Sequence, residues 1–366
     1  MGEGGNDYSW GEMGMFTMMV MTEGATIALT IMAKTIMTRG LSPFVFIAYT
    51  NALGSILLLP YSFFFHRERP RQPIFTRQLL LRCFLMGFTG IFLSQNLAFV
   101  GLSYSSPIVV CAMGLMIPAF SFLLSVALRK TELDFRRSST RAKITGTLVS
   151  FGGALVVELY KGPFIRKSSS STPSLQFIPQ LFVYYKPQDN WVLGGILLAA
   201  ASLCVSIWNI IQLGTVKKYP QVMKVASFYS LAGSIQCVMF SLFMERDPSA
   251  WKLNLNLDLF IIVLTAIYVS IVRSSIHVSC TRKKGPFYVP LFKPFGIVFA
   301  TTFGVSFFTN SLHYGSVLGA IIAGMGYYIV MLGQIREVEA QKEGDVEGVK
   351  SIFPEKVPLL QEDSQV

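Results

Sequence analysis

Apolar segments of about twenty residues, separated by short basic segments, constrain this chain more than any other feature. A helix that crosses the hydrocarbon core of a bilayer needs about 20 mostly apolar residues. The 366 residues are 52% hydrophobic and 14% charged, whereas soluble proteins average about 25% charged residues. We therefore predict an all-α membrane protein with ten transmembrane helices, at about residues 14–37, 42–63, 79–100, 106–128, 143–160, 191–213, 222–244, 258–278, 286–308 and 313–333.

The basic residues between these segments predict the orientation of the chain. Lys and Arg gather after the even-numbered segments, within 67–77, 129–143, 217–224 and 282–284, whereas the odd loops GLSYSS and TNSL have none. Basic loops face the cytoplasm, so we expect both termini to be cytoplasmic. The net charge of +11 follows this topological pattern, and we do not expect nucleic acid as a partner.

The two halves of the chain resemble each other. GTLVSFGGALVVEL (146–159) aligns without gaps on GAIIAGMGYYIVML (319–332), and each half has a proline in its fourth segment, Pro118 and Pro294. Chance matches between apolar sequences are the alternative. Because five is an odd number, two copies of five helices enter the membrane from opposite sides. Such inverted repeats are typical of alternating-access carriers.

Five parts of the chain follow from this duplication. A Ser-rich stretch, RKSSSSTPS, lies between the halves, and we predict that it is an extracytosolic linker although it contains basic residues. Pro118 and Pro294 either break their helices or produce bends that the helices tolerate. The predicted parts are a cytoplasmic N-terminal segment at 1–13, a first five-helix repeat at 14–160, the linker at 161–190, a second repeat at 191–334 and a cytoplasmic tail at 335–366.

Glu23 is the feature that first suggests a function. It lies nine residues into the first segment, ~13 Å deep at 1.5 Å per residue. A charged side chain facing lipid at that depth is unfavourable by roughly 2.5–3.5 kcal/mol, so we expect Glu23 to face protein or water. Thr26, Thr30 and Lys34 share its helical face, and Lys293 in the ninth segment lies at a matching depth.

Other polar residues inside the segments complete a candidate translocation site. We expect them to converge with Glu23, Thr26, Thr30 and Lys293 on a cavity for a zwitterionic or anionic solute, with Lys293 or Arg273 binding a carboxylate and Glu23 an ammonium or a proton. The alternative is a structural Glu23–Lys293 pair, with polar groups that only join helices and an arginine that snorkels. These further residues are Gln95, Asn96, Trp208, Asn209, Gln212 and Arg273.

Several other functions find no support in the sequence. There is no GxxxxGK[ST] motif for ATP, and the five cysteines and three histidines are dispersed, without metal spacing. We therefore expect no cofactor, no metal and no enzymatic activity. A receptor that binds without transport is the remaining alternative class. The acidic residues before the first segment differ from the basic start of a signal peptide, so we expect this segment to remain as a helix.

Several motifs together resemble the plant nodulin-like transporters, also called Walls-Are-Thin-related or UMAMIT proteins, of the drug/metabolite transporter superfamily with two EamA repeats. They are Lys34 followed by GLSPFVFIAY, then GLSYSSP, IPAFSFLLSVALRKTEL, IWNIIQ with KKYP, KKGPFYVPLFKPF and LHYGSVLGA. The resemblance implies ten helices, cytoplasmic termini and facilitated transport of amino acids, often export. Auxin or another organic acid at an endomembrane is the alternative substrate.

The chain departs from this family at a few places, and its tail carries a sorting pattern. Glu132 follows the fourth helix whereas Asn310 stands at the equivalent place, and RSSIHVSC in the eighth segment is unusually polar. In the tail, Glu355 with Leu359 and Leu360 fits an acidic dileucine motif, which sorting adaptors bind. We expect a small-molecule substrate, a lipid bilayer and such adaptors as partners, at the plasma membrane or the vacuolar membrane.

Overall fold

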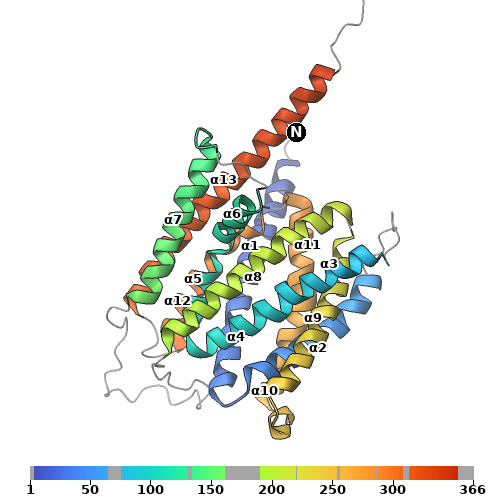
Figure 1. Cartoon of the computed structure of the whole chain (residues 1–366), viewed down its shortest axis with the longest axis vertical. Helices are drawn as coiled ribbons and strands as arrows, with labels where there is room; N and C mark the ends of the chain where they lie inside the picture. Colours follow the sequence, from blue (N-terminus) through green and yellow to red (C-terminus); the bar gives the residue numbers. More distant parts are fainter. Residues whose placement is uncertain are drawn as a thin grey trace, which may run out of the picture.

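The computed structural model is a bundle of helices (Figure 1). It describes residues 4–64, 76–129, 134–160, 190–219, 221–253, 256–285, 287–307 and 313–352. The linker call at 161–190, apart from its last residue, and the residues Glu132, Asn310, Glu355, Leu359 and Leu360 lie outside these ranges. Nine helical stretches in the described part are long and apolar enough to cross a bilayer.

Five transmembrane segments make up the first half of the chain. The third and fourth are each built from more than one helical element. In order they are α1 (Gly4–Thr38), α2 (Pro43–Phe64), α3 (Arg77–Gly87) with η1 (Phe88–Leu93) and α4 (Ser94–Tyr104), α5 (Pro107–Gly114) with α6 (Ile117–Ala127), and α7 (Ser138–Leu159).

Five segments also make up the second half, together with a short 3₁₀ turn, η2 (Pro248–Trp251), in a loop. The eighth and ninth are composite. In order they are α8 (Trp191–Lys218), α9 (Val222–Met244), α10 (Leu257–Ile267) with η3 (Tyr268–Arg273) and α11 (Ser274–Lys284), η4 (Pro290–Phe292) with α12 (Phe295–Phe307), and α13 (Tyr314–Ile352).

The third and eighth segments share one unusual construction, which supports the duplication. Each is an α-helix of 11 residues, a π-helical stretch of 6 residues and a second α-helix of 11 residues. π-Helical stretches are rare and occur mostly as single insertions at functional sites. Their recurrence at the same place in both halves indicates two copies of one ancestral unit, in agreement with the predicted fold of two five-helix repeats.

The packing of helices follows the same two-fold relation. The second helices of the two halves, α2 and α9, pack along each other, and so do the fifth helices, α7 and α13. Across the halves, α3 packs on α9 and α10 packs on α2. Exchanging the halves therefore reproduces these contacts. Figure 1 shows α7 and α13 side by side at one edge of the bundle, with α2 and α9 together at the other.

Glycines allow α7 and α13 to approach closely. A Cβ atom on Gly153 would lie 2.3 Å from the amide nitrogen of Ala323, and one on Gly146 would lie 2.6 Å from that of Val330. Small residues that bring backbones together are the usual means of joining helices in a membrane. The glycines that align the two repeats in the sequence therefore lie in the contact between them.

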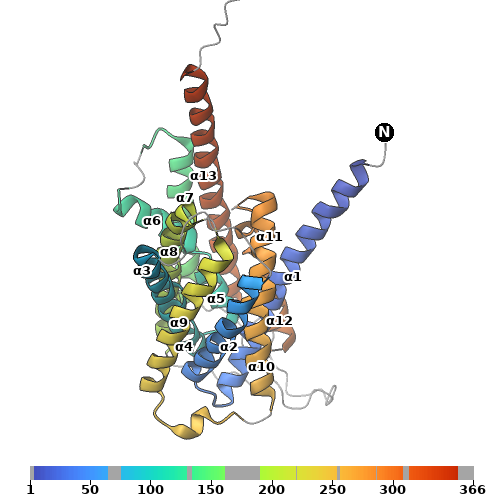
Figure 2. The same cartoon turned by 90° about the vertical axis from the view of Figure 1, so that its right-hand side faces the viewer.

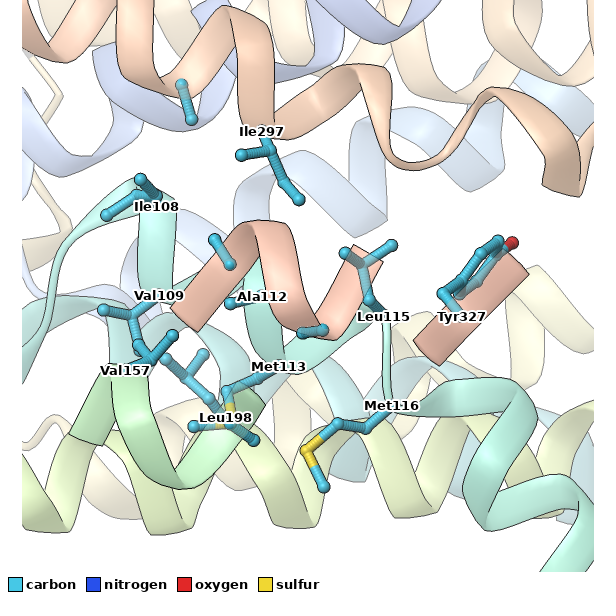
Figure 3. Packing of buried hydrophobic residues seen from close by; sticks show 14 of the residues in the cluster. Ile108, Val109, Ala112, Met113, Leu115, Met116, Val157, Leu198, Ile297 and Tyr327 are labelled. Carbon is cyan, nitrogen blue, oxygen red and sulfur yellow. The ribbon is translucent and has the colours of Figure 1, made fainter. Parts of the chain in front are cut away.

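The hydrophobic core gathers around α5 and the turn after it. Ile108, Met113 and Met116 are buried there, together with Leu198 of α8 and Ile297 of α12. Figure 3 shows these side chains filling the space between elements of both halves. Residues of the second repeat thus pack around the fourth segment of the first repeat, and the core around α5 contains residues of both halves.

Both proline-containing segments are interrupted. Between α5 and α6 the helix breaks at 115–116, two residues before Pro118. The ninth segment, expected as a helix over 286–308, forms η4 first and becomes α-helical only at Phe295, after Pro294. Proline supplies no N–H and clashes with the preceding turn, which explains both interruptions. The N-terminal end of α1 and the C-terminal end of α13 lie on the same side, here called the terminal side (Figure 2).

Candidate functional site

An ion pair joins the first helix of one repeat to the interrupted helix of the other. The Lys293 Nζ lies 2.8 Å from the Glu23 Oε1. The Glu23 side chain is 4% exposed, whereas that of Lys293 is 35% exposed. Burying a carboxylate is costly unless an opposite charge compensates it, and Lys293 supplies that charge for Glu23.

The helix interruption positions Lys293. It follows η4 directly and precedes Pro294, so its backbone does not belong to a continuous helix. Two tyrosines of α13 hold this stretch: the Tyr327 hydroxyl donates to the Pro290 carbonyl at 2.7 Å, and the Tyr328 hydroxyl donates to the Leu291 carbonyl at 3.0 Å. Carbonyl groups freed by the break are therefore bonded inside the protein, as backbone groups in a membrane require.

The threonines of α1 make hydrogen bonds within their own helix. The hydroxyl groups of Thr26 and Thr30 donate to the carbonyl oxygens of Thr22 and Thr26, one turn earlier. Thr26 also lies 3.4 Å from the hydroxyl of Tyr268, which itself donates to the Thr22 carbonyl at 2.6 Å. Tyr268 is the first residue of η3, and the sequence analysis did not predict it as a site residue. Its position just before the polar residues of the eighth segment was the available signal.

Arg273 ends the same π-helical stretch and is half-buried. Within the described part of the chain it makes no hydrogen bond or ion pair. It lies close enough to Tyr268 and His277 for electrostatic interaction, and Lys293 acts on His277 in the same way. Glu23 interacts electrostatically with Tyr268 as well. We call Glu23 and Lys293, together with Tyr268 and Arg273 at the two ends of η3, the central polar group.

Lys34 shares the helical face of Glu23 but has a different role. Its side chain is buried, and its Nζ donates to the carbonyl oxygens of Leu102 and Ser103 at 2.8 and 2.7 Å. These carbonyls belong to the last turn of α4, where the helix dipole attracts positive charge. Lys34 therefore fastens α1 to the C-terminal end of α4, away from the central polar group.

Replacing Lys34 by glutamine is expected to destabilise the protein by about 1.5–3 kcal/mol, since hydrogen bonds from a charged donor contribute about that much. Thermal unfolding of purified protein in detergent measures this effect. Lys252, an exposed lysine in the loop after η2, is the matched control, and Lys252→Gln is expected to leave the melting temperature unchanged. Equal melting temperatures for the two variants would contradict the role given to Lys34.

The remaining predicted residues lie on α4 and α8, and within the described part of the chain their hydrogen bonds and ring contacts are to residues outside the central polar group. Gln95 accepts a hydrogen bond of 2.6 Å from Asn51 of α2, and Asn96 donates to the Phe92 carbonyl at 2.7 Å. The Trp208 ring packs against Tyr229 of α9, 6.0 Å between centroids. The contacts of Gln95 and Trp208 join neighbouring helices, whereas this hydrogen bond of Asn96 stays within its own segment. The side chains of Asn209 and Gln212, also on α8, are half-buried.

The neighbours of each helix explain this separation. Helix α1 packs mainly on α12, whereas α8 packs mainly on α4, although both helices contact α4 and α5. The two helices therefore have different main partners, although they occupy corresponding places in the two repeats. In the described ranges, no group of three His, Cys, Asp or Glu residues is arranged to hold a metal ion.

Comparisons with known proteins identify the family. A family model described as the EamA-like transporter family matches residues 13–159. Two WAT1-related proteins of Arabidopsis thaliana are 61% and 59% identical to this chain, over 97% and 90% of it and 98% and 90% of their own lengths. The chain belongs to the WAT1-related family. A third WAT1-related protein from the same plant is 36% identical over 88% of the chain and 87% of its own length.

The WAT1-related chain also resembles a solved structure in its fold. A crystal structure of a protein whose function is not stated covers 86% of this chain and 97% of its own, with a TM-score of 0.51 and 16% identity. This likeness concerns the fold alone. Family and helices together show a multi-pass membrane protein that transports small solutes, built on the fold of the drug/metabolite transporters.

Proposed function

We propose that this WAT1-related protein is a secondary transporter of amino acids or similar small organic solutes, working by alternating access. The observation that carries the proposal is the Glu23–Lys293 ion pair of 2.8 Å, beside an interrupted helix. Interrupted helices at the interface of inverted repeats are where secondary transporters bind their substrates. Ionisable residues inside a membrane are rare and mark substrate or ion pathways.

The charges of the central polar group suit a zwitterion. Its described members contribute one negative charge, on Glu23, and two positive charges, on Lys293 and Arg273. An amino acid could place its ammonium group on Glu23 and its carboxylate on Lys293 or Arg273. Arginine presents its donors in a planar fork that matches a carboxylate. Because Lys293 and Glu23 are already paired, such a substrate would exchange one ion pair for two.

An organic acid such as auxin is the second candidate substrate. If the Glu23–Lys293 pair stays intact, the group keeps the single positive charge of Arg273. A site of that charge complements a monocarboxylate and leaves an ammonium group without a partner. The two candidate substrates therefore differ in their need for Glu23. Binding of an amino acid requires contact with Glu23, whereas binding of an organic acid leaves Glu23 paired with Lys293.

Reconstituted protein provides the test. Purified protein in liposomes is expected to move labelled amino acids down their gradient, with and without an imposed proton gradient. Unlabelled auxin and amino acids compete against each label and separate the two substrate candidates. Saturable binding of a solute without any flux would favour a receptor instead, and the absence of flux across a broad solute panel would overturn the proposal.

Arg273→Gln is expected to raise the KM for a transported carboxylate at least about tenfold, since the loss of a charge-assisted hydrogen bond contributes about 1.5–3 kcal/mol. The maximal rate should change less. Arg273→Lys keeps the charge and is expected to recover part of the affinity. A methyl ester of the same solute has no carboxylate, so its transport should not depend on residue 273. An unchanged KM in Arg273→Gln would remove this residue from the site.

The membrane and the orientation are further parts of the proposal. The alternation of basic loops supports cytoplasmic termini and an extracytosolic linker. The acidic dileucine pattern of Glu355, Leu359 and Leu360 supports binding of sorting adaptors and residence in the vacuolar or plasma membrane. Changing both leucines to alanine in a fluorescent fusion is expected to redistribute the protein between these membranes.

A further inference from the structure

The two repeats can be compared position by position. The third and eighth segments begin at Arg77 and Leu257, which are 180 residues apart. The same shift relates the first and sixth helices: it places Gly14 on Gly194 and aligns two hydroxyl residues of α1, Thr22 and Thr26, with Ser202 and Ser206 of α8. If the two repeats had the same arrangement, each contact in one half would have its counterpart in the other.

On the side opposite the termini, α4 is closely packed against α8. A Cβ atom on Gly101 of α4 would lie 2.9 Å from the Leu198 Cγ and 3.0 Å from the Gly194 carbonyl oxygen. One on Gly194 would lie 3.0 Å from the Ser105 Cβ. These distances leave no space between the two helices. Helix α4 also packs on α2, α1 and α5, so its whole length is enclosed.

A loop adds to the closure of that side. The Tyr49 hydroxyl of α2 donates to the Trp251 carbonyl at 2.9 Å, and their rings pack edge to face. The Trp251 indole in turn donates to the Glu245 carbonyl at 3.1 Å. The turn η2 is thereby held against the end of α2.

On the terminal side, the equivalent helices are packed much less closely. Helix α11 corresponds to α4, yet its contact with α1 is limited to the surroundings of Met19 and Cys280, which share a buried cluster with residues 289–292. It is joined to α2 by the hydroxyls of Ser275 and Tyr61, 2.8 Å apart. Gly14, the counterpart of Gly194, has no atom within 4 Å of a built Cβ. Figure 2 shows the N-terminal half of α1 leaning away from α11 and from the rest of the bundle.

The packing of α4 on α8 therefore differs from that of α11 on α1, although the two repeats correspond in sequence. This difference needs a physical explanation. Transporters with inverted repeats adopt two states in which the repeats exchange their conformations. We infer that the structure is the state open on the terminal side, and that α11 and α1 form the second gate of the transporter. In the alternate state Thr281 of α11 packs against Gly14 and Met18 of α1, as Gly101 packs here against Gly194 and Leu198.

The inference rests on the proposed transport function but identifies its gates by residue. Closing the terminal side moves α1, which carries Glu23, toward α11, which follows Arg273 directly. Glu23 lies on the moving helix and Lys293 does not, so a substrate that binds between them can bias the two states. A ligand shifts such an equilibrium only through different affinity for the two states.

Cross-linking tests the gate. Met18→Cys and Thr281→Cys are combined with Cys280→Ala, because Cys280 is adjacent to the cysteine introduced at position 281. A short bifunctional maleimide then reports how often α1 and α11 meet. Gly194→Val should prevent closure of the opposite side, where its Cβ meets Ser105 and Gly101, and is expected to raise cross-linking several-fold. Gly14→Val fills the free space on the terminal side and is expected to lower it.

A second measurement separates misfolding from a change of state. Each variant is checked for a single symmetric peak by size-exclusion chromatography, and a cysteine at Leu198 is probed with an impermeant maleimide. Gly194→Val should make this cysteine reactive from the side opposite the termini, and Gly14→Val should not. Equal cross-linking in the two variants, with both folded, would overturn the inference. A shift in cross-linking without flux of any solute would instead leave the gates in place and overturn transport.

Discussion

Replacing Lys293 by methionine is expected to abolish transport and to destabilise the protein by about 3–5 kcal/mol, the usual effect of breaking a buried ion pair. Glu23 is buried and would lose its counter-charge. The substitution removes the ion pair at 2.8 Å that carries the proposed function. Liposome flux and thermal unfolding measure the two effects.

The double variant Glu23→Gln with Lys293→Gln separates function from packing. It removes both charges and keeps side chains that can hydrogen-bond, so its stability should return close to that of the wild type. Replacing a buried pair by neutral groups is often neutral or stabilising. Transport is expected to stay absent, because neither an ammonium nor a carboxylate finds a charged partner. Recovery of transport along with stability would show that the pair is only structural.

The ion pair could be anticipated from the sequence because depth in a membrane can be counted. Glu23 and Lys293 lie at similar distances from the ends of their apolar segments, and a buried acid needs a base. Of the residues grouped with the pair, Arg273 was predicted from the sequence, whereas Tyr268 was not. The hydrogen bond from Tyr268 to the Thr22 carbonyl and the placement of Lys34 on the carbonyls of α4 depend on how each helix is rotated and on which helices are neighbours.

The grouping of polar residues on α8 with those on α1 illustrates the same limit. Each stripe is visible in the sequence, since a helix repeats every 3.6 residues. Periodicity shows that one face of a helix is polar, but it does not show which neighbouring helix that face contacts. Trp208 meets Tyr229 of α9, whereas Glu23 meets the interrupted ninth segment.

The helices themselves were largely predictable, with two exceptions of different origin. Hydropathy identifies the membrane segments because a run of about twenty mostly apolar residues is typical of a helix that crosses a bilayer. The late start of α12 follows from Pro290 and Pro294, whose missing N–H groups leave a short 3₁₀ turn where an α-helix was expected. The π-helical stretches have no comparable signal in either segment alone. Only the matched lengths of the third and eighth segments in the structure reveal them as a shared feature.

Gly153→Val is expected to prevent formation of the contact between α7 and α13. A Cβ atom at this position would lie 2.3 Å from the Ala323 nitrogen, 2.8 Å from its Cα and 2.8 Å from the Gly319 carbonyl oxygen. All three are backbone atoms, so no side chain can turn aside, and the helices would have to separate. Overpacking a well-packed site costs about 1–3 kcal/mol where neighbours adjust; here they cannot, and we expect the yield of folded protein to collapse.

The neighbouring glycine provides the matched control. Gly152 lies in the same helix and has no atom within 4 Å of a built Cβ, so Gly152→Val changes helix propensity and hydrophobicity in the same way without meeting α13. Its yield and melting temperature are expected to stay near those of the wild type. Fluorescence-detected size-exclusion chromatography of the two variants, expressed in parallel, makes the comparison. Because the two glycines differ only in the face that they occupy, similar loss in both would mean that α7 tolerates no larger residue anywhere, and similar tolerance would mean that α7 and α13 do not approach as closely as the structure shows.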